Sequence, residues 1–355
     1  MYERFYGFSR KPFRLSPDPA FFYKGHSHGR AYAYLRYGLH MGEGFVVITG
    51  AVGTGKTTIA RALIASLNQE RTQAIQIVST FLAPDELLRM IAGEFGLQTK
   101  GQGKAELLQA LGEHFLQRTR QGQQVLVIID EAQNLSAESL EELRMLANLQ
   151  HEGRALLQVF LLGQEEFHAT LRAPDMEHLR QRIIASYHLT PFDEAETRQY
   201  IEHRLRLAGW QQDPAIDDAA YALIHAYTGG IPRKINVFCD RLFLHACLEE
   251  KHLIDEEEVQ TVIREKEQEF DFGAMEQGAD AQAAGARENG EGMGNIRSLE
   301  GHGSRLSQIE RRLLELEQRY ERDRRRLRLV LEALLTEEEL DLERLLADLR
   351  SRSAS

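Results

Sequence analysis

The stretch from Phe45 to Thr58 constrains the fold of this chain more than any other part of it. Phe45–Ile48 is an apolar run that predicts a buried strand, and it leads into a loop with the spacing G-x-x-x-x-G-K-[ST]. The residues expected to surround an anion there are Gly50, Ala51, Val52, Gly53, Thr54, Gly55, Lys56, Thr57 and Thr58. Glycines let backbone N–H groups point inward, and the helix that follows adds partial positive charge. A strand, a glycine-rich loop and a helix in this order predict nucleotide binding.

Two side chains give this loop its expected chemistry. Lys56 is placed to reach the β- and γ-phosphates of a nucleotide, and the hydroxyl of Thr57 is placed to coordinate Mg²⁺. The sequence therefore predicts ATP and Mg²⁺ as ligands.

A carboxylate pair supplies the second half of the expected site. The apolar run Val125–Ile129 predicts a central strand that ends in Asp130 and Glu131. Asp130 is expected to hold Mg²⁺ through water, and Glu131 to polarise a water against the γ-phosphate. The alternative is a pair that merely caps the next helix. Together with the glycine-rich loop, the pair favours hydrolysis over binding alone.

Three further polar residues bear on hydrolysis. Gln164 follows the predicted strand 156–162 and is expected to contact the attacking water or the γ-phosphate, although it could be an ordinary turn residue. Arg180 and Arg182 precede the predicted strand 184–189. Either could reach the nucleotide of a neighbouring subunit and stabilise charge there, or both could be surface arginines. At most one of them needs to be functional.

The region 45–190 predicts an α/β fold. Apolar strands are expected at 45–49, 74–79, 125–130, 156–162 and 184–189. Helical stretches are expected between them, at 58–69, 84–96, 104–121, 136–149 and 165–182. Alternation of this kind indicates a parallel sheet of about five strands covered on both faces.

The flanking segments differ in character. Residues 1–44 are rich in aromatic residues and proline and are expected to pack on the nucleotide-binding domain. Part of this segment could cover an adenine, or it could serve packing alone. Residues 191–266 predict a small domain of four helices, at 193–208, 217–228, 233–250 and 255–266. Arg233 falls in a first helical turn, where a cation is unfavourable unless a bound phosphate compensates.

The C-terminal part changes composition twice. Residues 267–303 are rich in Gly, Ala, Glu, Gln and Asn and predict a flexible linker. Apolar residues from Leu306 to Leu334 follow a 3-4 alternation, interrupted at Asp323, and this pattern predicts a coiled coil over residues 304–350. Its arginines between 319 and 328 are read either as a solvated face or as a patch for anionic lipid or nucleic acid.

Composition and charge restrict the cellular compartment and the classes of binding partner that we expect for this protein. The net charge of −11 argues against a dedicated nucleic-acid binder. Cys239 and Cys247 lie too far apart on one predicted helix for a disulfide, which suits a reducing compartment. No signal peptide and no apolar run long enough for an integral membrane span is apparent. A cytoplasmic protein is expected, at most peripheral to the inner face of a membrane through partners.

Together these elements resemble the AAA+ ATPases. Gly50–Thr57 resembles Walker A, Asp130-Glu131 Walker B, Gln164 sensor 1, Arg182 the arginine finger, and Arg233 in Gly-Ile-Pro-Arg sensor 2. Phrases such as Lys11-Pro-Phe-Arg-Leu-Ser-Pro-Asp-Pro19 and Leu179-Arg-Gln-Arg-Ile183 are similar to the general secretion pathway protein A (ExeA-like) branch. Within that branch the chain resembles the secretion ATPase of XrtA/PEP-CTERM (exosortase) exopolysaccharide systems. The resemblance covers roughly residues 1–266.

The resemblance carries functional implications. It implies a P-loop AAA+ sheet with a C-terminal helical lid, Mg²⁺-dependent ATPase activity, and a homo-oligomer with an arginine finger acting in trans. It also implies a protein partner, docked through the coiled coil, in cell-envelope export or exopolysaccharide assembly. The alternative is an ATP-dependent, DNA-associated regulator related to transposition helper ATPases. The chain departs from secretion-type relatives in having a polar linker and coiled coil where they continue into a membrane helix and a peptidoglycan-binding part.

Overall fold

The computed structural model describes residues 1–78 and 82–268. These residues belong to one compact unit, Met1–Met275. The predicted linker beyond residue 268 and the predicted coiled coil with its arginines lie outside the described residues.

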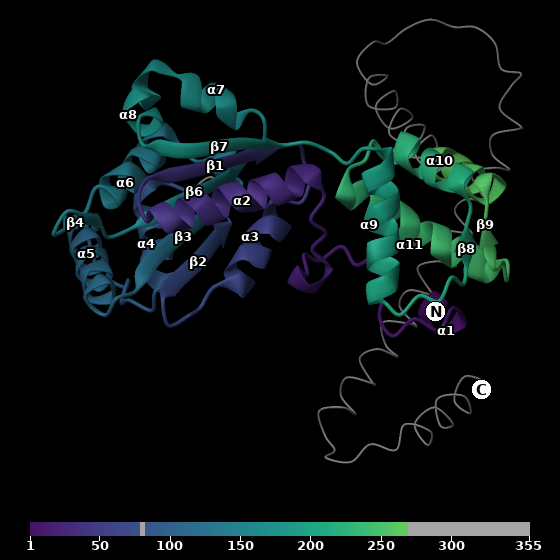
Figure 1. The fold of residues 1–355 in the computed structure, drawn as a ribbon. Coiled ribbons are helices and arrows are strands. Elements are labelled where there is room, and N and C mark those ends of the chain that lie inside the picture. The colour runs from purple at the N-terminus through teal and green to yellow at the C-terminus, as the bar shows by residue number, and fades with distance from the viewer. Residues whose placement is uncertain (79–81, 269–355) are drawn as a thin grey trace, which may run out of the picture. The chain divides into compact units, whose positions relative to one another are not determined.

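A five-stranded parallel sheet forms the centre of the nucleotide-binding domain (Figure 1). Its strand order is β2-β3-β6-β1-β7. The bounds are Phe45–Gly50 for β1, Thr72–Val78 for β2, Gln124–Asp130 for β3, Gln158–Gly163 for β6 and Ile183–Leu189 for β7. Every residue of β1 and β6 is buried, as the continuous apolar runs require in a sheet covered on both faces. The predicted parallel α/β sheet is confirmed.

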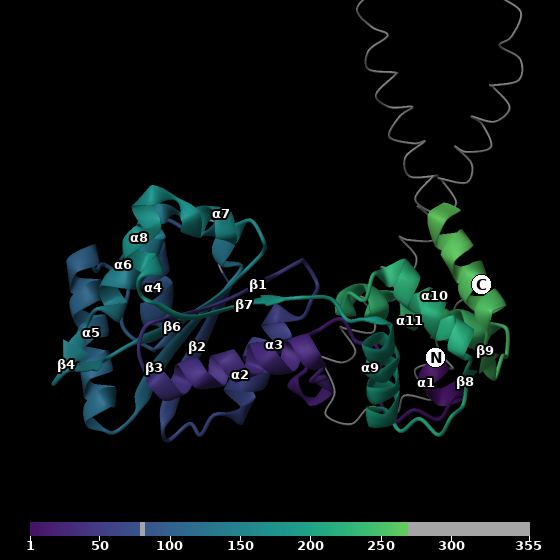
Figure 2. The same cartoon turned by 45° about the horizontal axis from the view of Figure 1, so that its top comes forward.

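Helices cover both faces of this sheet (Figures 1 and 2). One face packs on α2 (His26–Met41) and α3 (Lys56–Ser66) through side chains such as Val46 and Ile48. The opposite face uses alternate residues, such as Phe45 and Val47, in a second core. The helices of that second core are α4 (Pro84–Glu94), α5 (Lys104–Arg120) and α6 (Ala137–Ala147). The hairpin of β4 (Gln150–His151) and β5 (Arg154–Ala155) connects α6 to β6.

The predicted helix over 165–182 is wrong as a single element. The structure has α7 (Phe167–Arg172), a 3-10 turn at Pro174–Met176 and α8 (Glu177–Arg180) instead. Pro174 is the physical reason, because a proline disfavours helical geometry in the residue before it. Ala173 accordingly has ψ of 146°.

The lid is helical, as predicted. It contains α9 (Glu194–Leu207), α10 (Asp218–Thr228) and α11 (Pro232–Leu248), and residues 256–268 form its last described helix. The strands β8 (Ala215–Ile216) and β9 (Leu253–Ile254) pair in parallel beside them.

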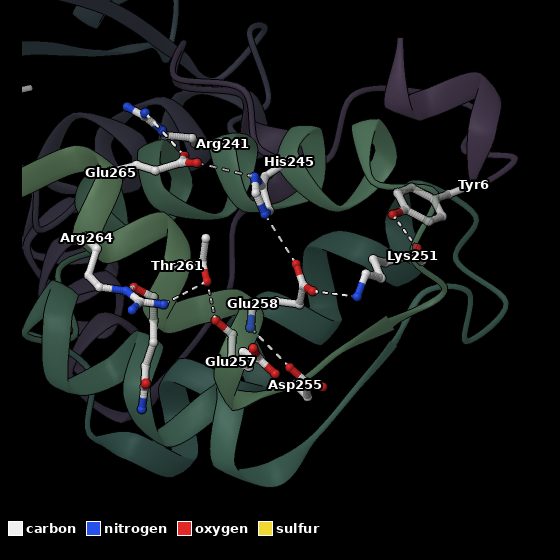
Figure 3. A network of polar contacts seen from close by, with 11 residues as sticks. Tyr6, Arg241, His245, Lys251, Asp255, Glu257, Glu258, Thr261, Arg264 and Glu265 are labelled. Atoms are coloured by element: carbon white, nitrogen blue, oxygen red, sulfur yellow. Dashed lines mark hydrogen bonds and ion pairs between the residues drawn. The ribbon is translucent and has the colours of Figure 1, made fainter.

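One carboxylate ties the last described helix of the lid to α11 (Figure 3). Glu258 accepts the ammonium of Lys251 at 3.0 Å and lies 3.3 Å from Nε2 of His245. Thr261, on the same helix, donates its hydroxyl to the carbonyl of Glu257.

The N-terminal segment divides between the two domains. Its first rings pack around Phe243 of the lid, namely Tyr2, Tyr6, Phe8 and Phe13. This differs from the expected packing on the nucleotide-binding domain. The lid offers not only an apolar surface but also acceptors for the two phenols, because Tyr2 donates to Asp240 and Tyr6 to the carbonyl of Lys251. Helix α2 then covers the sheet as expected. Among residues 1–78 and 82–268, no helix is both long and apolar enough to cross a membrane.

Candidate nucleotide site

The glycine-rich loop joins the end of β1 to the start of α3. Gly53 and Gly55 have φ of +83° and +101°, which favour glycine and let the loop curl. The hydroxyl of the buried Thr54 donates to the carbonyl of Ala51 at 2.9 Å and closes the curl. The glycine conformations and this hydrogen bond together fix the shape of the loop.

Lys56 is folded back into this loop. Its side chain is buried, and its ammonium donates to the carbonyl oxygens of Gly50 and Ala51 at 2.7 and 3.0 Å. Burial lowers the pKa of Lys56, and the carboxylates of Glu131 and Asp130 only partly offset this effect. The ammonium is thus poorly neutralised, which favours an incoming anion.

The predicted metal residues meet at the strand ends. The Thr57 hydroxyl donates to Oδ2 of Asp130 at 2.6 Å, although the two residues lie 73 positions apart in the chain. Burial raises the pKa of Asp130, and the hydrogen bonds from Thr57 and from the Glu131 N–H oppose that rise. A hydroxyl and a carboxylate side by side are oxygen ligands of the kind that Mg²⁺ takes, so these residues fit that ion.

Glu131 is held by two glutamines. Its backbone lies in the left-handed region, with φ of +54°. Oε2 of Glu131 accepts hydrogen bonds from the amides of Gln133 at 2.6 Å and Gln164 at 3.1 Å. Burial alone would raise the pKa of Glu131, but these hydrogen bonds and the charge of Lys56 outweigh burial and lower it. The carboxylate of Glu131 is therefore held in its ionised form, and Gln133 and Gln164 fix its position.

Gln133 was not predicted from the sequence. Besides binding Glu131, its side-chain oxygen accepts the backbone N–H of Gln164 at 2.9 Å. Its position two residues after Glu131 was the only available signal.

The lid contacts the loop directly. The backbone N–H of Arg233 donates to the carbonyl of Gly53 at 3.1 Å. A Cβ at Gly53 would lie 2.8 Å from Cβ of Arg233, so a glycine is required for this approach. The side chain of Arg233 is exposed and lines the cavity beside the loop. The N–H of Phe192 donates to Gly230 at 2.9 Å and closes the hinge of the lid.

A cavity of about 320 Å³ extends from the loop between lid and sheet. Loop and strand residues line one side, including Val52, Gly55, Lys56, Thr57, Thr58 and Glu131. Residues 14–18 and 21–23 of the N-terminal segment line another side. Residues 2–13 of that segment thus pack in the lid, whereas residues 14–18 and 21–23 line the cavity.

Two further residues of this cavity were not predicted. His28 of α2 is buried and donates from Nε2 to the carbonyl of Thr54 at 2.7 Å. Burial lowers the pKa of His28, so its ring stays neutral against the loop. Arg204 of α9 donates to the carbonyls of Pro12 and Arg14 at 2.7 and 3.3 Å. It thereby fixes the wall of the cavity to the lid.

The two arginines before β7 differ in their contacts. Arg180 donates to the carbonyls of Leu171 and Ala173 at 2.6 and 2.7 Å, and so caps the end of α7. The half-buried side chain of Arg182 makes no hydrogen bond or ion pair within the described part of the chain. The guanidinium of Arg180 is therefore engaged within its own chain, in contrast to that of Arg182.

Comparison with known proteins agrees with this geometry. Residues 39–171 match the AAA domain model. The chain is 39% identical to general secretion pathway protein A of Aeromonas hydrophila over 287 residues, which is 81% of this chain and 52% of that protein. It is 33% identical over 141 residues to ATP-dependent target DNA activator B of Escherichia phages D108 and Mu, covering 40% of this chain and 43% of each relative. The chain thus spans about half the length of these curated relatives or less.

Solved structures show the same fold. The ORC2 protein of Aeropyrum pernix matches with a TM-score of 0.53 at 20% identity, over 68% of this chain and 67% of that one. Cdc6p of Pyrobaculum aerophilum matches with a TM-score of 0.55 at 18% identity, over 74% and 70%. The nucleotide-binding domain and lid therefore have the P-loop AAA fold, and the chain contains an AAA domain within a region that is similar in sequence to general secretion pathway protein A.

Proposed function

We propose that the chain hydrolyses ATP in a Mg²⁺-dependent reaction. The observation that carries this proposal is the hydrogen-bonded set of Glu131, Gln133 and Gln164, which stands beside Lys56 and the Thr57–Asp130 pair. A binding module needs the loop alone. An ionised base held by a glutamine from the neighbouring strand is what hydrolysis requires in addition.

Each residue has a role in this reaction. Lys56 and the loop N–H groups bind the phosphates, and Thr57 and Asp130 would hold the metal. When bound, Mg²⁺ would neutralise charge on the phosphates. Glu131 accepts the proton of the attacking water, and Gln164 orients that water or the γ-phosphate. Arg233 contacts the phosphates and so links the lid to the bound nucleotide. Residues 14–23 line the pocket for the adenine.

We assign the finger role to Arg182 of a neighbouring copy. Its guanidinium has no partner within the described residues of its own subunit, in contrast to Arg180. The active unit is then a homo-oligomer whose site is complete only between subunits. The setting we propose is cell-envelope export or exopolysaccharide assembly of the XrtA/PEP-CTERM type, on the similarity to general secretion pathway protein A and the sequence phrases above.

Steady-state phosphate release with and without Mg²⁺ tests the reaction. Lys56→Ala should abolish nucleotide binding and turnover. Glu131→Gln should retain binding and lose roughly 100-fold or more in kcat, because the base is removed while the phosphate loop is intact. Unchanged turnover in both variants would refute ATP hydrolysis at this site. Nucleotide-dependent binding without turnover in the wild type would instead indicate a non-catalytic switch.

A second candidate is an ATP-dependent, DNA-associated regulator. The similarity to target DNA activator B favours it, and the net charge of −11 opposes it. A mobility shift of long duplex DNA that requires ATP and weakens with salt would support it. No shift at low salt would leave the secretion setting as the better proposal.

A further inference from the structure

A buried hydroxyl between two imidazoles lies next to the phosphate loop. Thr49 is completely buried and immediately precedes Gly50. Its Oγ1 lies 2.7 Å from Nε2 of His168 and 3.0 Å from Nδ1 of His188. None of these three residues belongs to the nucleotide site described above.

The three residues connect separate elements. Thr49 is the penultimate residue of β1, and His188 is its register partner on β7. His168 lies on α7, the short helix that begins three residues after Gln164. The cluster therefore ties the segment carrying Gln164 to the strand that carries the phosphate loop.

The hydrogen-bond chemistry of this cluster depends on proton number. A hydroxyl has one proton to donate and two lone pairs. With a neutral imidazole as acceptor, the Thr49 proton is satisfied and the second imidazole can donate to the same oxygen. If both rings become cations, neither imidazole can accept the proton of the buried Thr49 hydroxyl. The positive charges of His168 and His188 then also repel each other, because the ring centroids lie 6.0 Å apart.

The surroundings disfavour charge on His168 specifically. Burial lowers the pKa of His168, and the neighbouring His188 and Arg172 lower it further, while Glu165 opposes them. Glu165 lies 3.6 Å from Nε2 of His188, so it can compensate a charge on that ring. The groups that face His168 are thus Thr49 of β1, His188 of β7, Arg172 of α7 and Glu165 of the preceding loop. At neutral pH the neutral His168 form therefore prevails.

We propose that Thr49, His168 and His188 are positioning residues for ATP hydrolysis, which hold α7 and Gln164 in register with the phosphate loop and release them when both imidazoles are protonated. This inference rests on the proposed ATPase activity. It predicts an effect on kcat rather than on nucleotide affinity, because the cluster contacts the segment carrying Gln164 and not the nucleotide cavity. It also predicts an acid limb in the pH profile, that is, a fall in kcat as the pH decreases. Because the native pKa of His168 lies below its usual value near 6.5, the cluster is intact above about pH 6.5 and is lost as pH falls through the native pKa.

Matched substitutions separate hydrogen bonding from charge. Thr49→Val removes the hydroxyl, and Thr49→Ser restores it. His168→Gln and His188→Asn each place a non-titrating amide near the ring nitrogen that contacts Thr49. His40→Gln, at an exposed histidine in the last turn of α2, is the control. We expect Thr49→Val to lower kcat roughly 10- to 100-fold with nucleotide Kd unchanged, and Thr49→Ser to recover most of it. His168→Gln should keep turnover at neutral pH and flatten the acid limb, which His40→Gln should leave intact.

A second measurement does not require turnover. Amide hydrogen exchange of residues 163–172 should be faster in Thr49→Val than in Thr49→Ser at the same pH, whereas exchange in the lid should match. Equal exchange in the two variants would overturn the inference even if the wild type were inactive. A wild-type acid limb retained in His168→Gln, or a Thr49→Val defect confined to nucleotide Kd, would also overturn it. A wild type without turnover but with faster exchange in Thr49→Val would refute the proposed ATPase and retain the structural cluster.

Discussion

The side-chain amide of Gln164 donates a hydrogen bond to the carboxylate of Glu131 at 3.1 Å. The two residues follow the neighbouring strands β6 and β3, whose register pairs Val127 with Val159. Because parallel strands end at the same edge of a sheet, the adjacency of β3 and β6 brings the Glu131 carboxylate and the Gln164 amide together. The same contact makes the base dependent on the segment that leads into α7.

Gln133 is expected to be as important for turnover as Gln164. It donates to Glu131 and accepts the backbone N–H of Gln164, so Gln133→Ala removes both contacts at once. The pKa of Glu131 should rise toward its usual value, and kcat should fall roughly 10- to 100-fold with little change in nucleotide Kd. Gln181→Ala, at an exposed glutamine, is the control. Wild-type kcat in Gln133→Ala would show that Glu131 does not need this support.

The two arginines before β7 should have opposite phenotypes. Arg180→Ala leaves the carbonyls of Leu171 and Ala173 without their donor, so it should lower the free energy of unfolding by about 1–3 kcal/mol. Arg182→Ala should leave stability unchanged and reduce kcat on the order of 1,000-fold, the usual loss for a charge-stabilising finger.

Mixing variants tests whether Arg182 acts in trans. Arg182→Ala retains an intact phosphate loop, and Lys56→Ala retains an intact finger. Combined, they should regain turnover that neither shows alone, with a maximum near equal proportions. Absence of recovery at every ratio would place the function of Arg182 within its own subunit.

The hinge of the lid offers a matched pair of glycines. Gly229 and Gly230 both have positive φ, +61° and +66°. A Cβ at Gly229 meets nothing within 4 Å, whereas at Gly230 it would lie 1.9 Å from the carbonyl oxygen of Phe192. Gly229→Ala should therefore cost only about 1–2 kcal/mol of backbone strain. Gly230→Ala should cost considerably more, because it must also break the Phe192–Gly230 hydrogen bond. Similar melting temperatures for the two variants would contradict this closure of the hinge.

Local patterns were sufficient to predict the sheet and the first half of the site. Continuous apolar runs mark buried parallel strands, and the glycine spacing with Lys56 and Thr57 marks the loop. The contact between Thr57 and Asp130 also follows from such patterns, because each residue is fixed at the end of a predicted strand or loop.

The remaining features depend on contacts between distant parts of the chain. Arg204 binds the carbonyl of Pro12 across 192 positions, and no local pattern identifies that partner. The same is true of Thr49 and His168, 119 positions apart. The predicted helix over 165–182 failed for a local reason, because Pro174 disfavours helical geometry in the residue before it and divides the stretch.

Asp130 should make the stability of the nucleotide-free protein depend on pH. Burial raises its pKa above the ordinary 3.8, so the native protein keeps a proton that the unfolded chain has lost. The stability that this residue contributes is therefore present below about pH 3.8 and is lost as pH rises through the native pKa. Asp130→Asn does not titrate. In urea unfolding without Mg²⁺, the difference in free energy of unfolding should move in favour of the variant as pH rises from about 4 to about 7.5. A difference that is independent of pH would mean that Asp130 has an ordinary pKa.

Arg204 is expected to couple the stability of the lid to nucleotide affinity. The side chain is 5% exposed, donates to Pro12, Arg14 and the hydroxyl of Tyr200, and lies 4.8 Å from the ring of Phe21. Arg204→Ala leaves three acceptors without this donor and should lower the free energy of unfolding by about 2–4 kcal/mol.

The same substitution should weaken nucleotide binding, because residues 14–23 wall the cavity and Arg204 holds them to α9. Arg206→Ala, which removes only an exposed pair with Glu202, is the matched control and should change the free energy of unfolding by less than about 1 kcal/mol. Arg204→Lys keeps the charge without the planar fork and should recover little of either property. Thermal unfolding and equilibrium titration with a fluorescent ATP analogue measure the two effects. If Arg204→Ala lost stability while its nucleotide Kd stayed at the wild-type value, the N-terminal segment would serve packing alone, because the wall it forms would not touch the bound nucleotide.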